Sequence, residues 1–166
     1  MPTGPAARIT DSVAHPLPPV LTPGPGSLNV LIGFLPAWRG IPLAAVAALQ
    51  AAKAAADTAV QTAVAATAAA TGTPGAPAAL AAEQATKGAV LSSMSSAITG
   101  ASAGADIHMC ATPSPVPPHG PGVVTTGSAT VWINNLPACR LGDTIMEALG
   151  PPNVIAKGEA TVIVGG

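Results

Sequence analysis

The strongest constraint on the fold is a short sequence motif that occurs on both sides of an alanine-rich stretch. Residues Gly26–Arg39 match residues Gly127–Arg140 at a constant offset of 101 positions, without a gap. Each copy reads as a short strand, a tight turn and a return strand, and Asn134-Asn135 suits the turn of a tight hairpin. One such unit is too small to bury a core, so we expect the copies to pack against each other.

Two further pieces of the motif lie near the ends of the sequence. Residues 158–166 form a third copy, and Pro5–Arg8 resemble the end of a further copy. Repeats of one small β unit usually stack or wrap around an axis. We therefore predict a mainly β fold, a small cone of short β-hairpin repeats with pseudo-threefold character.

The alanine-rich stretch, residues 41–105, holds 27 alanines in 65 residues and favours helix. Helical patterns run over residues 42–71 and 78–99, and a break rich in glycine and proline separates them. Gly100 marks the expected end of the second helix. A short break between two helices favours an antiparallel hairpin.

We expect this helical hairpin to be an insertion into a discontinuous β domain formed by residues 1–40 and 106–166. The alternative is two separate domains, but residues 1–40 are too few to fold alone.

Charges in the alanine-rich stretch are few and are spaced to pair along a helix. Lys53–Asp57 and Glu83–Lys87 are opposite charges at i,i+4 spacing. The run Thr58–Ala82 between them has no charge, but it contains Gln61, several threonines and the helix break. We favour a soluble hairpin, and a transmembrane pair is the alternative.

The overall composition limits the classes of protein to consider. Charged residues make up 8% of the chain and the formal net charge is −1, so a basic surface for nucleic acid is not expected. The aromatic residues are Phe34, Trp38 and Trp132, which are few for a hydrophobic core. We therefore expect the fold to be stabilised by a metal ion or by a partner surface. Residues 1–5 lack the basic and apolar regions of a signal peptide, which predicts a cytosolic chain with reduced thiols.

Three histidines and one cysteine form the candidate metal site. His108 and Cys110 alternate in sequence, so on a strand they point to the same side. His119 follows a proline-rich turn that can fold the chain back, and His15 comes from the first β segment. Three imidazoles and one thiolate complete a tetrahedral shell, which predicts a structural Zn²⁺. The alternative is three surface histidines and a buried cysteine.

Other residues compete for roles around this site. Cys139 can serve as the thiolate, but it occupies the position that Trp38 has in the matched copy, which favours a packing role. Asp11 and Asp106 can orient imidazoles as outer partners of the metal, or cap turns.

A catalytic metal needs an open coordination position and a general base. If Cys110 is not a ligand, three histidines and a water molecule would resemble a hydrolytic site. The candidate bases are Glu83, Glu147 and Glu159, and none lies near a histidine in sequence. We therefore expect no enzymatic activity.

With these motifs the chain resembles the PAAR-repeat proteins. Pro5–Asp11 is similar to the motif that names the family, and the segment from Pro117 to Asp143 is similar to its repeat core. The resemblance covers about 100 residues, everything outside the insertion. The chain departs from the family where Trp38 and Cys139 replace a small residue, and where Gly40 is not followed by an aspartate.

The resemblance implies a β cone that caps the blunt end of a trimeric VgrG-like spike, with one cone per trimer. Such cones tip contractile injection systems, which include type VI secretion systems and phage-tail-like particles. It also implies a Zn²⁺ held by three histidines and one cysteine, here His15, His108, Cys110 and His119.

The function expected from the resemblance is a non-enzymatic tip that punctures a membrane. The particle assembles in the cytoplasm and then delivers the tip outside or into the target cell. The helical insertion is expected to act as an adaptor for effector cargo or for a baseplate component. The alternative is an insertion that enters the target membrane.

Overall fold

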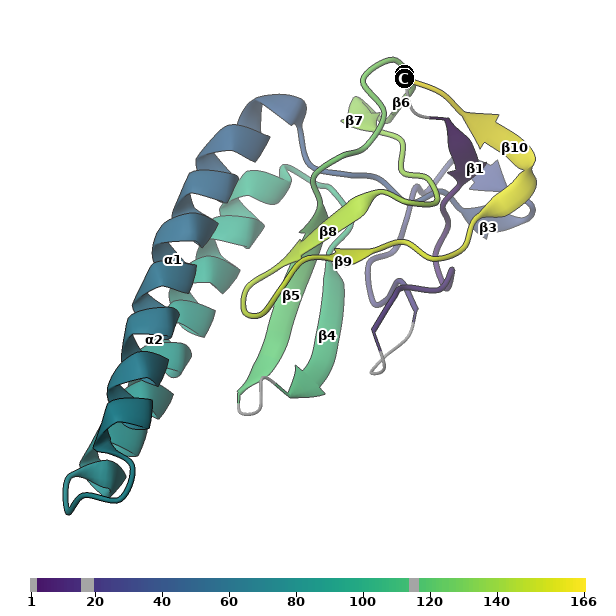
Figure 1. Cartoon of the computed structure of the whole chain (residues 1–166). Helices are drawn as coiled ribbons and strands as arrows, with labels where there is room; N and C mark the ends of the chain where they lie inside the picture. The colour runs from purple at the N-terminus through teal and green to yellow at the C-terminus, as the bar shows by residue number, and fades with distance from the viewer. Residues whose placement is uncertain (1–2, 16–19, 114–116) are drawn as a thin grey trace.

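The computed structural model describes residues 3–15, 20–113 and 117–166. A helical hairpin lies beside a β part built from small sheets (Figure 1). The helices are α1 (Leu43–Ala70) and α2 (Ala76–Ser102). The strands are β1 (Gly4–Ala6), β2 (Leu31–Ile32), β3 (Leu35–Pro36), β4 (His108–Pro113), β5 (Pro118–Val124), β6 (Trp132–Ile133), β7 (Leu136–Pro137), β8 (Thr144–Glu147), β9 (Asn153–Val154) and β10 (Glu159–Val164).

The two helices follow the predicted positions closely, except at the end of α2. Alanine has the highest helix propensity, and Pro42 and Pro77 lie at the helix starts, where proline is tolerated. The prediction that Gly100 ends the second helix is wrong, because α2 continues to Ser102 and Ala103 then adopts a left-handed conformation. A single helical glycine costs about 1 kcal/mol, and burial of Ile98 and Ser102 holds the last turn in place.

Helix α2 is the one that packs on the sheet. Its buried Val90, Met94 and Ile98 join an apolar cluster with Val123 of β5 and Met146 of β8. Both predicted charge pairs form within the hairpin. By length and composition α1 could cross a membrane.

The two matched copies of the motif form β2–β3 and β6–β7, which are two-residue hairpins. Both central residues of each turn have positive φ, 53° and 67° at Gly33-Phe34 and 52° and 63° at Asn134-Asn135. This is the conformation that a two-residue hairpin prefers. The third copy, in β10, pairs instead with β1 near the other end of the sequence.

Ala7 in the Pro5–Arg8 piece, and the equivalent residues Trp38 and Cys139 of the two matched copies, are joined by a closed ring of backbone hydrogen bonds. The amide of Ala7 donates to Cys139, that of Cys139 to Trp38, and that of Trp38 back to Ala7, at 2.8, 3.1 and 2.9 Å. The ring brings together segments that are up to 132 positions apart in the sequence.

An arginine next to each ring residue pairs with a buried aspartate. In each pair the aspartate accepts from the backbone amide and the guanidinium of the arginine: Arg8–Asp11, Arg39–Asp106 and Arg140–Asp143. Asp11 and Asp106 therefore bind arginines, and the predicted alternative in which they orient imidazoles is not what the structure shows. No aspartate follows Gly40 in the sequence, and Asp106 instead pairs with Arg39 as Asp143 pairs with Arg140.

The remaining strands form one antiparallel sheet in the order β4-β5-β8-β9. The two helices, of 28 and 27 residues, hold more residues than all the strands of the described chain. The fold is thus a mixture of α and β, not mainly β as predicted from the repeats. The reason is that the alanine-rich stretch forms nearly continuous helix, whereas each β unit contributes only a few paired residues.

Candidate metal centre

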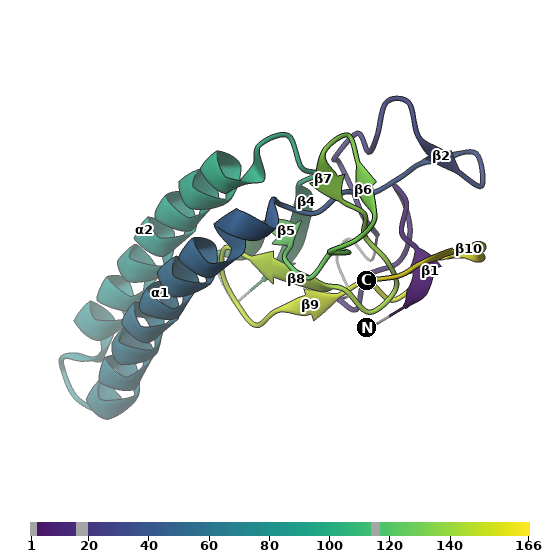
Figure 2. The ribbon, with the colours of Figure 1, turned by 90° about the horizontal axis from the view of Figure 1, so that it is seen from above.

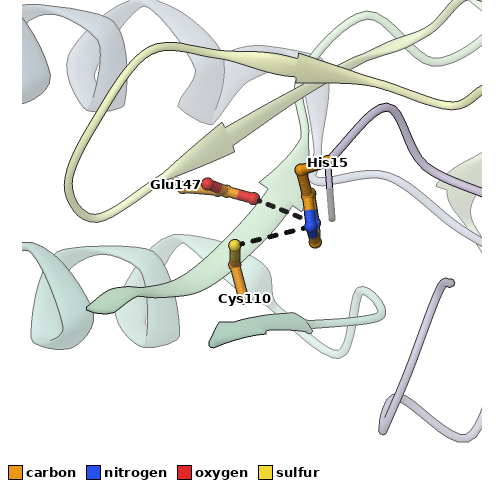
Figure 3. A group of neighbouring side chains, drawn as sticks. All are labelled: His15, Cys110 and Glu147. Carbon is orange, nitrogen blue, oxygen red and sulfur yellow. Dashed lines mark hydrogen bonds and ion pairs between the residues drawn. The ribbon is translucent and has the colours of Figure 1, made fainter. Parts of the chain in front are cut away.

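His15, Cys110 and Glu147 form a buried cluster at the centre of the β part. One possible ligand atom from each lies within 4.8 Å of the others. The Cys110 sulfur lies 3.7 Å from His15 Nδ1, and Glu147 Oε1 lies 3.5 Å from His15 Nε2 (Figure 3). These atom types are ligands for a transition metal, so the group could hold a metal ion.

The Arg–Asp pairs explain why these three residues meet. Each follows one of the paired aspartates by four positions: His15 after Asp11, Cys110 after Asp106 and Glu147 after Asp143. Each aspartate fixes the start of its segment, and the three segments then converge.

His108 lies beside this cluster, also from β4. Its Nε2 atom is 2.7 Å from His15 Nε2 and 4.0 Å from Glu147 Oε1. The buried His108 and Cys110 alternate with the half-exposed Met109, as the strand pattern predicted. Two nitrogens at 2.7 Å need a proton or a cation between them, because two lone pairs at that distance repel.

His119, from β5, reaches the cluster through Glu147. Its Nδ1 atom lies 2.7 Å from Glu147 Oε2. Its Nε2 edge faces Gly150, where an added Cβ would lie 2.7 Å from that nitrogen. Of the four predicted ligands, the structure gathers His15, His108 and Cys110, and it places His119 on the outer side of Glu147.

Glu147 is the residue that the sequence analysis missed. No glutamate lies near a histidine in the sequence, but β8 pairs with β5 and thereby places Glu147 against His119 in space. A signal was present in the sequence, since Glu147 follows its aspartate by the same four positions as His15 and Cys110.

Two buried atoms of the cluster lack a hydrogen-bond partner among the described residues, Glu147 Oε1 and His108 Nδ1. Glu147 is fully buried, and an unpaired carboxylate oxygen in such a place is costly. Oε1 points towards the two histidine nitrogens and Cys110, so a cation among them would satisfy it. The donor set therefore fits a metal ion.

Burial also sets the protonation of the cluster. Desolvation lowers the pKa of His15, and it lowers the pKa of His108 to about 4, with a further contribution from the charge of His15. Both imidazoles are then neutral near pH 7, as metal ligation requires. Burial raises the pKa of the Cys110 thiol, so metal binding there releases a proton.

The C-terminal part of the chain, residues 116–166, matches the sequence model of the PAAR motif. The chain therefore contains a PAAR motif. No curated protein and no solved structure matches it. The matched PAAR segment contains His119 and Glu147, whereas His15, His108 and Cys110 lie before it. A PAAR motif indicates a spike-tip protein of type VI secretion-like systems, a structural class rather than an enzyme class.

Proposed function

We propose that this PAAR protein is a non-enzymatic tip that caps a trimeric VgrG-like spike in a contractile injection system. The observation that carries the proposal is a set of exposed apolar side chains on the ends of all three motif copies. Leu31 and Phe34 on the first are 61% and 95% exposed, Trp132 on the second is 49% exposed, and Ile163 on the third is 61% exposed. Large exposed apolar side chains on neighbouring units support an interaction site at this end of the β part.

The three copies are also linked to one another at this end. Asn134 donates to Asn29 at 2.8 Å, Ser128 donates to the carbonyl of Gly165, and the Glu159 carboxylate lies against Gly33. Strands β3, β6, β7 and β10 gather at one end of the β part, away from the end where β4 finishes and β5 begins (Figures 1 and 2). A ring of three similar units suits a threefold partner.

Pseudo-threefold character is part of this proposal. It is supported by the ring of backbone hydrogen bonds, the three Arg–Asp pairs and the common position of His15, Cys110 and Glu147 after their aspartates. A single chain with three similar faces can contact three identical subunits in similar ways.

The metal in this proposal is a structural Zn²⁺. His15, His108 and Cys110 supply three donors, and for the fourth the geometry favours Glu147 Oε1 over the predicted His119. The two nitrogens of His119 face Glu147 and Gly150, so His119 acts as an outer partner that orients the carboxylate. The ion joins β segments from both sides of the helical hairpin and stiffens a small fold.

The helical hairpin, residues 41–105, is in this proposal an insertion into the β domain. Asp106 N donates to Arg39 O at 3.1 Å, the same bond that Asp143 N makes to Arg140 O across two residues. The ends of the insertion therefore meet. The hairpin would serve as an adaptor for effector cargo or a baseplate component. Entry into the target membrane is the second candidate role, favoured by the length and low charge of α1.

Binding to a purified trimeric VgrG-like spike tests the proposed function. In light scattering, the full chain is expected to form a complex of one chain per trimer. In the cell, this complex would assemble in the cytoplasm before the system fires. Phe34→Glu with Trp132→Glu should abolish the complex, whereas Leu80→Glu, at a half-exposed site on α2, should not. Binding of the double variant at wild-type strength would exclude this end of the molecule as the docking surface.

A further inference from the structure

Lys53 of the helical hairpin bonds to Gly150, which packs against His119 beside the metal centre. We propose that Lys53 of α1 is a positioning residue for the metal centre, so that docking of the hairpin and occupation of the centre stabilise each other. This inference rests on the proposed metal centre and extends it to a residue outside the β part.

The contact begins with an unusual buried lysine. The side chain of Lys53 is 9% exposed although it lies on a helix with few buried positions. Its Nζ atom donates to the backbone carbonyl of Gly150 at 2.9 Å and also binds Asp57. A charged side chain is buried only where its hydrogen bonds offset the loss of hydration, so this bond anchors α1 to the loop after β8.

Gly150 packs directly against the imidazole ring of His119. It has a φ of 77°, and a Cβ there would lie 2.7 to 3.0 Å from three atoms of the imidazole ring. The backbone of Gly150 therefore sets how far the ring can move away from Glu147. The bond from Lys53 holds that backbone in place.

The second helix contacts the same region from the other side. A Cβ at Gly120, next to His119, would lie 2.5 Å from Leu91 Cδ1 of α2. Leu149 N donates to His119 O at 2.9 Å, which ties the loop to β5. Both helices thus contact the segments on either side of His119: α1 contacts the loop at Gly150, and α2 contacts β5 at Gly120.

Coupling of this kind is reciprocal. If the docked hairpin holds His119 and Glu147 in the geometry that binds the ion, the bound ion must stabilise the docked hairpin by the same free energy. Lys53 is the residue on which the coupling depends, because it bonds to the loop directly.

The test measures metal binding by full-length Lys53→Met with Co²⁺ as the probe. We expect an affinity below wild type by up to about 10-fold, the lower end of the effect for direct outer partners of metal ligands, because Lys53 acts through Gly150 and His119. We also expect a changed visible spectrum of bound Co²⁺. Lys53→Arg, which keeps a donor for the Gly150 carbonyl, should recover most of the affinity. Lys87→Met is the matched control, since Lys87 is a buried hairpin lysine that pairs with Glu83.

Hydrogen exchange gives an independent measurement. Adding Co²⁺ to the wild-type chain should slow amide exchange in α1 around Lys53, and this slowing should be smaller in Lys53→Met. A Lys53→Met chain that is folded, and that binds Co²⁺ with wild-type affinity and spectrum, would overturn the inference while leaving the metal centre intact. Failure of the wild-type chain to bind Co²⁺ or Zn²⁺ would instead overturn the proposed metal centre itself.

Discussion

Asp106→Ala is the substitution that most directly tests how the chain closes across the helical hairpin. Asp106 is fully buried and accepts hydrogen bonds from Gly26 N, Arg39 N and the Arg39 guanidinium, at 2.8 to 3.0 Å. The backbone amide of Asp106, just after the hairpin, also donates to the carbonyl of Arg39, just before the hairpin. Loss of the Asp106 side chain should therefore separate the two β segments.

The magnitude follows from the charge that would be left behind. Removing one partner of a buried ion pair costs about 3 to 5 kcal/mol, because the other charge stays buried without compensation. Arg39 is 9% exposed, so its guanidinium would stay buried without its partner and the upper half of this range applies. A loss of about 4 kcal/mol would lower the Tm of a chain of this size by roughly 10 °C.

Denaturant unfolding followed by the fluorescence of Trp38 provides the assay. Trp38 is buried beside Arg39, and a Trp132→Phe background removes the half-exposed second tryptophan. The control is Lys157→Ala, which removes a charge at an exposed position, where the expected cost is below about 0.5 kcal/mol. If Asp106→Ala costs no more than Lys157→Ala, the Arg39–Asp106 pair does not close the fold and the reasoning is refuted.

Two further predictions concern the hairpin interface and the buried histidines. Gly120→Ala should destabilise the chain and release α2 from β5, because φ is 80° and the new Cβ would lie 2.5 Å from Leu91, whereas Gly88→Ala in open space should stabilise it by about 1 kcal/mol. Thermal unfolding of both variants checks this, and equal effects would contradict the close packing. In the metal-free chain His108 has a pKa of about 4 when folded against about 6.5 when unfolded, so the stability should be complete above pH 6.5 and fall by about 3 kcal/mol as the pH drops to 4. A pH titration of unfolding tests it, and a His108→Gln chain with the same pH dependence as wild type would show that another group is responsible.

The repeats determined much of the β part in advance. The matched copies form hairpins at the predicted turns, since Asn and Gly tolerate positive φ and short apolar runs need a partner strand. The alanine-rich stretch gave both helices and both charge pairs, because helix propensity and i,i+4 spacing are local properties. The end of α2 was missed because burial of Ile98 overrides the local effect of Gly100.

The candidate site was predicted in part. His108 and Cys110 follow from strand alternation, which is also local. Glu147 was overlooked because only the pairing of β8 with β5 brings it to His119, 28 positions away. The role of Lys53 had no sequence signal beyond its i,i+4 pair, since its contact with Gly150 crosses 97 positions.

The sequence by itself determined which units this protein contains: three copies of a β motif, two helices and a set of candidate metal ligands. These follow from backbone propensity and from the spacing of residue types, which act over a few positions. Only the tertiary structure decided which side chains meet, because the buried Arg–Asp pairs and the ring through Ala7, Trp38 and Cys139 fix three distant segments around one point. That arrangement placed a carboxylate at the centre of the predicted site and moved His119 to its edge.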